Sequence, residues 1–166
     1  PEREALVDFS RPILTDVSEI LVTGPAAPKI AALDDLSGAT VHVRRSSSYY
    51  TSLLRLSAAF ESAGNAPIDL VPADEHLEDE DLLELVNAGL LPMIVMDDHK
   101  AEFWAQFFPD ITLHPNIAVN TGGAIAWAFR EDSPGLESAV NAFIADNAKG
   151  SLLGNILYDR YLGDRR

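Results

Sequence analysis

Short apolar runs alternate along the chain with longer segments whose apolar residues recur at helical spacing. Leu53, Leu56 and Phe60 lie on one face of a predicted helix, and the run 93–96 is apolar on both faces, as in a buried parallel strand. We predict strands at 20–23, 40–44, 68–71, 93–96, 111–113, 117–119 and 124–130. We predict helices at 48–63, 79–87, 98–108, 133–147 and 152–161, with a short helical piece near 30–36.

The repeated strand–helix–strand order predicts an α/β fold. We expect a three-layer α/β/α sandwich whose sheet is mostly parallel, with helices on both faces. In such folds ligands bind just beyond the carboxyl ends of the strands. That rule selects the segments 46–48, 73–74 and 97–98, each of which follows a predicted strand.

Three consecutive serines, Ser46, Ser47 and Ser48, stand between a strand and the start of a helix. A helix N-terminus attracts anions, because its first N–H groups lack intrahelical partners and the helix dipole favours negative charge. Capping the helix requires only one serine. Both roles remain open, and the excess hydroxyls favour contact with a carboxylate or a similar group.

Asp97 and Asp98 follow the most apolar strand. Only one of them can cap the next helix, which leaves the other carboxylate for a cationic group of a ligand. A metal site is not expected, because adjacent residues rarely converge on one ion and no distant partner pair stands out. No cofactor is expected either.

Two further segments contain residues typical of binding sites, but we expect them to have structural roles only. The acidic run 74–84 lacks the spacing of a calcium loop and is expected to be a solvated helix face. Thr121, Gly122 and Gly123 resemble a phosphate loop only superficially, since no Gly-Lys-Ser/Thr follows, and we expect a turn there.

The composition narrows the function. The 166 residues carry a net charge of −14, which disfavours nucleic acid and anionic lipid as partners. Cysteine is absent, so disulfides, thiol catalysis and zinc–thiolate sites are excluded. No apolar run is long enough to insert into a membrane, and no catalytic constellation is recognisable. The opening Pro1, Glu2 and Arg3 suggest a part of a longer protein.

The order of these pieces resembles the type II periplasmic binding fold, the two-lobed fold of amino-acid transport receptors. The segment 3–12 is similar to the family pattern Arg-x-x-x-(apolar)-x-Phe-(Ser/Thr)-x-Pro. The segment 36–43 is similar to the Leu-x-Gly-x-x-Val-x-Val pattern at the start of the second lobe. The serine run then falls on the carboxylate-binding Gly-Thr-Thr position, and Asp97 falls on the acid that pairs with a ligand amino group.

The resemblance implies a set of ligand-binding residues. A carboxylate would be held from Arg3 and from the serine run, an ammonium by Asp97, and Tyr49 would line the pocket. The implied ligand-binding residues are Arg3, Ser46, Ser47, Ser48, Tyr49 and Asp97. No residue is expected to be catalytic.

The second half is similar to the binding module of the membrane-bound lytic murein transglycosylase F family. The matching phrases lie at 45–49, 79–89, 126–130, 149–157 and 160–162. The resemblance implies three parts: 1–25 from the end of the first lobe and the hinge strand, 26–120 as the second-lobe core, and 121–166 as the returning strand and C-terminal helices.

This family implies a module that senses cell-wall peptides or amino acids for a peptidoglycan-cleaving enzyme. The catalytic domain, expected beyond Arg166, would lie outside this chain. The implied ligand is an amino acid or muropeptide, and peptidoglycan would be contacted through the parent protein. The implied location is the periplasm or cell envelope, with outer-membrane anchoring through the parent. The alternative is a solute receptor for an amino-acid or peptide transporter.

Overall fold

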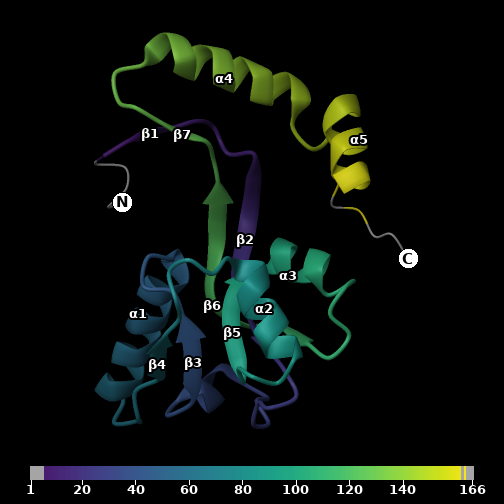
Figure 1. Cartoon of the computed structure of the whole chain (residues 1–166). Coiled ribbons are helices and arrows are strands. Elements are labelled where there is room, and N and C mark those ends of the chain that lie inside the picture. The colour runs from purple at the N-terminus through teal and green to yellow at the C-terminus, as the bar shows by residue number, and fades with distance from the viewer. Residues whose placement is uncertain (1–5, 162, 164–166) are drawn as a thin grey trace. The chain divides into compact units, whose positions relative to one another are not determined.

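The computed structural model describes residues 6–161 and 163, and Figure 1 shows their course. The strands are β1 (Asp8–Phe9), β2 (Leu14–Thr23), β3 (Thr40–Val43), β4 (Asp69–Pro72), β5 (Met93–Asp97), β6 (Thr112–Ile125) and β7 (Ala128–Phe129). The helices are η2 (Leu33–Leu36, a 3-10 helix), α1 (Ser48–Ser62), α2 (Asp79–Asn87), α3 (Asp98–Trp104), α4 (Pro134–Asn147) and α5 (Leu152–Tyr161). The predicted α/β fold is confirmed. No helix in the described residues is both long and apolar enough to cross a membrane.

The chain forms two compact units. One comprises residues 18–121, and the other comprises the chain up to Val17 together with the chain from Gly122 onward. Both boundaries fall inside long strands, β2 and β6. The two units are therefore connected by extended backbone and not by loops.

The 18–121 unit contains the strands that were predicted from their apolar runs. β3 and β4 pair in parallel, with Val41 opposite Leu70, and β3 lies beside β5 (Figure 1). β2 lies between β5 and β6 and pairs with β5 in the antiparallel sense. The prediction of a mostly parallel sheet therefore holds for β3 and β4 but not for the ladder between β2 and β5.

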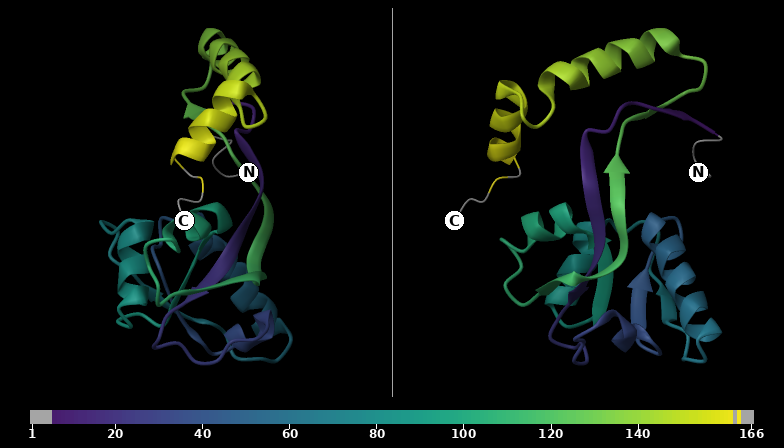
Figure 2. Two further views of the ribbon diagram at one scale, coloured as in Figure 1. Left: turned by 90° about the vertical axis from the view of Figure 1, so that its right-hand side faces the viewer. Right: turned by 180° about the vertical axis from the view of Figure 1, so that it is seen from behind.

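Helices cover both faces of these strands. α1 leads from β3 to β4 and α2 leads from β4 back to β5, so right-handed crossovers place the two helices on opposite faces (Figure 2). The core between them is closed to water. Its fully buried side chains include Leu21, Val22, Val41, Leu53, Leu83, Val86, Met93 and Met96.

The segment 111–130 differs from its prediction. The expected strands at 111–113 and 117–119 are one continuous strand, β6, which also includes Thr121, Gly122 and Gly123. The expected turn at these three residues is therefore wrong. Gly122 has a φ of 70°, and a Cβ on Gly123 would lie 3.1 Å from the Val17 carbonyl oxygen. Glycine lets the strand continue here where another residue would strain it.

The other unit is built on a short β1–β7 ladder with Asp8 opposite Phe129. The Ser10 N–H extends it by donating to the Trp127 carbonyl at 2.9 Å. Trp127 stacks on Phe143 of α4, with ring centroids 6.1 Å apart. These contacts tie α4 to the ladder.

Candidate ligand-binding site at the carboxyl ends of β3 and β5

Ser47 caps helix α1. Its hydroxyl accepts a hydrogen bond from the Tyr50 N–H at 3.3 Å and donates to the Arg44 carbonyl at 2.8 Å. Its backbone is extended, as an N-cap requires. The cap satisfies one first-turn N–H and closes the turn that leads from β3 into the helix.

Ser46 belongs to a loop that already holds a carboxylate. Its hydroxyl donates to Glu75 Oε2 at 2.6 Å, and the Arg45 N–H donates to Glu75 Oε1 at 2.8 Å. The Ser46 hydrogen bond is the main reason that the pKa of Glu75 is lowered. The donors of this loop are thus spaced to bind a carboxylate group.

Ser48 is the serine whose donors remain unused. No residue in the described part of the chain contacts its hydroxyl by a hydrogen bond, and the N–H groups of Ser48 and Tyr49 have no partner there. They stand at the first turn of a 15-residue helix, where free N–H groups and the dipole favour an anion.

Tyr49 connects the start of α1 to the end of β5. Only 6% of it is exposed, and its hydroxyl accepts from the Asp97 N–H at 3.2 Å and reaches Asp79 Oδ2 at 3.4 Å. Burial, followed by the negative charges of Asp79 and Asp97, raises the pKa of Tyr49. The phenol therefore stays neutral and fixes the distance between the two candidate ligand contacts.

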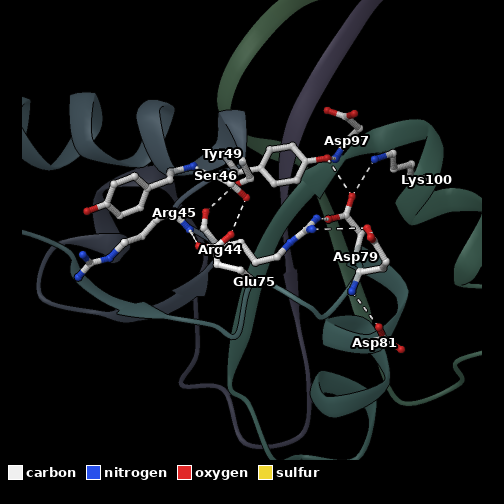
Figure 3. A network of polar contacts seen from close by, with 12 residues as sticks. Arg44, Arg45, Ser46, Tyr49, Glu75, Asp79, Asp81, Asp97 and Lys100 are labelled. Atoms are coloured by element: carbon white, nitrogen blue, oxygen red, sulfur yellow. Dashed lines mark hydrogen bonds and ion pairs between the residues drawn. The ribbon is translucent and has the colours of Figure 1, made fainter.

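Asp79, the first residue of α2, is the hub of a buried ion-pair network (Figure 3). Arg44 Nη2 lies 2.6 Å from Asp79 Oδ1, and Lys100 Nζ lies 2.7 Å from Asp79 Oδ2. Burial by itself would raise the pKa of Asp79, but the hydrogen bonds and charges of Lys100 and Arg44 outweigh it and lower the pKa. Asp79 is thus the nearest carboxylate to both cations, and Arg44 also reaches Glu78 at 3.4 Å.

The Asp97 carboxylate forms no ion pair with another described residue, and it interacts with the hydroxyl of Tyr49. It occupies the N-cap position of α3 but makes no side-chain cap bond. Asp98 instead accepts from the His99 N–H at 2.8 Å and from the Ser18 N–H at 3.2 Å. Figure 3 shows the carboxylate of Asp97 pointing away from Asp79. Burial raises the pKa of Asp97, against the opposing charges of Lys100 and His99.

The structure thus brings Ser48, Tyr49 and Asp97 together around one region, all within the 18–121 unit. Ser46 and Ser47 lie in the same loop, with their hydroxyls engaged by Glu75 and by the helix cap. Arg3 lies outside the described residues, and its ligand role stays a prediction. The described residues contain no cluster of three His, Asp or Glu side chains that could hold a metal ion.

Sequence reasoning missed the Arg44–Asp79–Lys100 network. The acidic run 74–84 was expected to be a solvated helix face, but Asp79 is 8% exposed. Glu75 is exposed as expected and lies before α2, where it accepts a hydrogen bond from the serine loop. The expectation of a solvated position is wrong at Asp79. A usable signal was present: Arg44 follows the strand that pairs with the strand preceding the acidic run.

Comparisons with known proteins bear on the fold of the chain. No family model matches the chain. A curated relative, the membrane-bound lytic murein transglycosylase F of Desulfosudis oleivorans, is 29% identical over 160 residues. The match covers 96% of this chain and 33% of the relative, so the chain spans about a third of the length of that relative.

Solved structures show the same fold. The substrate-binding protein of an amino acid ABC transporter superposes with a TM-score of 0.77 at 21% identity, covering 98% of this chain and 66% of that one. An ancestral arginine-binding protein superposes with a TM-score of 0.73 at 21% identity, and the match covers 98% of this chain and 67% of that one. A structure from work on glutathione import in Streptococcus mutans superposes with a TM-score of 0.78 at 19% identity, and the match covers 98% of this chain and 65% of that one. The chain has the type II periplasmic binding fold, and the predicted resemblance is confirmed.

Proposed function

We propose that the chain is a binding domain for an amino acid or a small peptide. The proposal rests on one observation: a buried side chain connects a set of hydrogen-bond donors that have no partner to a carboxylate that forms no ion pair. The first turn of α1 at Ser48 has unpartnered N–H groups, and the Asp97 carboxylate forms no ion pair with a described residue. The buried Tyr49 joins the two. One group favours an anion and the other a cation, as a zwitterion requires.

The ligand carboxylate would bind at the start of α1. The Ser48 hydroxyl and the first-turn N–H groups would donate charge-assisted hydrogen bonds, and the helix dipole would add to them. The bonds from Ser46 and the Arg45 N–H to Glu75 support this assignment, because the neighbouring loop already binds a carboxylate. Arg3 would supply a further cation from the N-terminal segment.

The ligand ammonium would bind at Asp97. Arg44 and Lys100 form their ion pairs with Asp79, and neither lies within ion-pair distance of the Asp97 carboxylate, although the charge of Lys100 acts on it. An ammonium that reaches Asp97 would satisfy a partly buried carboxylate whose pKa is otherwise raised by burial. Requiring both poles would exclude simple carboxylates and simple amines.

The biological setting is also part of the proposal. The curated relative is a lytic murein transglycosylase, which supports a sensing module that binds amino acids or muropeptides and regulates a peptidoglycan-cleaving enzyme in the periplasm. Peptidoglycan would be contacted by the parent protein, anchored at the outer membrane. The solved structures include an amino acid transporter's substrate-binding protein, which equally supports a solute receptor in the same compartment.

The gene distinguishes the two settings. A lysozyme-like domain encoded after Arg166 would favour the regulatory module, and a stop codon there would favour the receptor. Release of soluble glycan fragments from purified peptidoglycan by the full-length gene product would give the same answer.

The binding claim is tested by calorimetric titration of L-amino acids and a muropeptide into the protein and two variants. We expect Asp97→Asn and Ser48→Ala each to lower the affinity about tenfold or more, since each removes a hydrogen bond to a charged group. Ser62→Ala, which removes an exposed hydroxyl near the other end of α1, is the matched control. Unchanged affinity in both site variants would overturn the assignment.

A further inference from the structure

Glu19 is a buried carboxylate that the site described above does not use. It lies in β2, only 6% of it is exposed, and its Oε2 is buried without a hydrogen-bond partner in the described part of the chain. Buried carboxylates are rarely left unpaired, because losing hydration without compensation is costly. Its position therefore calls for a physical explanation.

The register of the sheet places Glu19 beside Asp97. The two residues are directly opposite each other in the antiparallel β2–β5 ladder. Directly opposite residues project from the same face of a sheet, with Cβ atoms about 5 Å apart. Glu19 thus shares the face of the carboxylate that we assign to the ligand ammonium.

No cationic side chain of the described residues lies within ion-pair distance of Glu19 or Asp97, although the charges of Lys100 and His99 act on Asp97. Arg44 and Lys100 form their ion pairs with Asp79, and Arg44 also reaches Glu78 at 3.4 Å. The Nδ1 atom of His99 lies 3.7 Å from Oδ1 of Asp98. Among the described residues no ion pair involves Glu19 or Asp97.

We infer that Glu19 and Asp97 together form an acidic subsite that selects ligands with a second cationic group. The ligand class is then amino acids or peptides with a side-chain ammonium or guanidinium, such as diamino acids. Asp97 takes the α-ammonium and Glu19 the additional cation. The inference rests on the proposed amino-acid site and adds the identity of its ligand class.

The test compares L-lysine with L-norleucine, which has a similar aliphatic side chain without the terminal ammonium. In calorimetric titrations the protein binds lysine at least tenfold more tightly than norleucine. Glu19→Gln lowers the lysine affinity about tenfold or more and leaves norleucine affinity within about twofold. Glu84→Gln, which removes an exposed charge on α2, leaves the ratio unchanged.

Each other outcome has a distinct meaning. Equal affinity for the two ligands, or a ratio that survives Glu19→Gln, overturns the subsite while leaving the amino-acid site in place. Binding of neither ligand overturns the proposed function and the subsite with it. The melting temperatures of the ligand-free proteins test whether Glu19 has only a structural role. Glu19→Gln melts at the same or a higher temperature, because a neutral amide costs less to bury than a carboxyl group that can ionise. A lower melting temperature with an unchanged ratio would mean that Glu19 only supports the fold.

Discussion

Asp97 and Asp98 are neighbours in the chain with opposite surroundings. Asp98 accepts two backbone hydrogen bonds, whereas Asp97 makes no cap bond, and we propose that it binds the ligand ammonium. The sequence predicts that one of the two carboxylates stays free, because a helix has one N-cap. It does not predict which residues neutralise Lys100, since Asp79 reaches it only through tertiary packing.

The raised pKa of Asp97 predicts a pH effect on stability. Burial raises the pKa above the unfolded value, so the folded protein holds the proton to a higher pH and loses stability as pH rises through that pKa. Asp97→Asn removes the effect. We expect the variant to be more stable than the parent at neutral pH, with the difference vanishing near about pH 4, as measured by urea unfolding. A variant less stable at neutral pH would contradict the account.

The lowered pKa of Asp79 predicts the opposite pH dependence of folding stability. Lys100 and Arg44 lower its pKa, so its stabilisation is complete above the unfolded pKa and is lost as pH falls through the lower folded pKa. Asp79→Asn leaves Arg44 buried without a full partner, and we expect a loss of about 3 kcal/mol in unfolding free energy. Urea titration measures it. Glu80→Gln, on the exposed side of α2, should cost under about 0.5 kcal/mol, and equal losses in both variants would refute the hub role.

The start of α1 shows what local sequence determines at the scale of one element. A serine before a helical apolar pattern predicts a cap, and the structure places Ser47 there. The three serines look alike in sequence, and only the fold gives them different partners, because Glu75 comes from the segment after β4. β6 shows the converse, since Pro115, Gly122 and Gly123 indicate breaks that sheet pairing overrides.

The serines therefore provide a matched pair of variants. We expect Ser47→Ala to lower the unfolding free energy by about 1 kcal/mol, because it removes the α1 cap. Ser48→Ala should change stability by less than about 0.5 kcal/mol and still weaken ligand binding. Chemical unfolding and calorimetry of both variants measure the two effects. The same loss of stability in both would contradict separate capping and binding roles.

For the whole molecule, the order of strands and helices predicts the α/β fold, and the superposed structures confirm it. The order of the elements follows from local patterns, but the lengths of β2 and β6 do not, since both strands are longer than predicted. The antiparallel β2–β5 ladder does not, because pairing between strands some 70 residues apart is set by the fold as a whole. The Glu19–Asp97 juxtaposition depends on that ladder, which is why sequence reasoning passed over Glu19.

Ligand binding should stabilise the folded chain. At a ligand concentration 100 times the dissociation constant, the expected gain is about 2.7 kcal/mol, which corresponds to a rise in melting temperature of about 5 °C or more. Differential scanning calorimetry with L-lysine measures the rise. Asp97→Asn should lose most of it at the same concentration, and a full rise in that variant would contradict the site.

The most direct test of the central claim is an amide NMR titration of isotope-labelled protein with L-lysine. We expect the largest saturable shifts at Ser48 and Tyr49, whose N–H groups would bind the carboxylate, and at Glu19, Asp97 and Asp98 around the ammonium groups. The start of α1 and the end of β5 should respond with one common affinity. Saturable shifts confined to other parts of the chain, or none at millimolar lysine, would contradict a zwitterion site between Ser48 and Asp97.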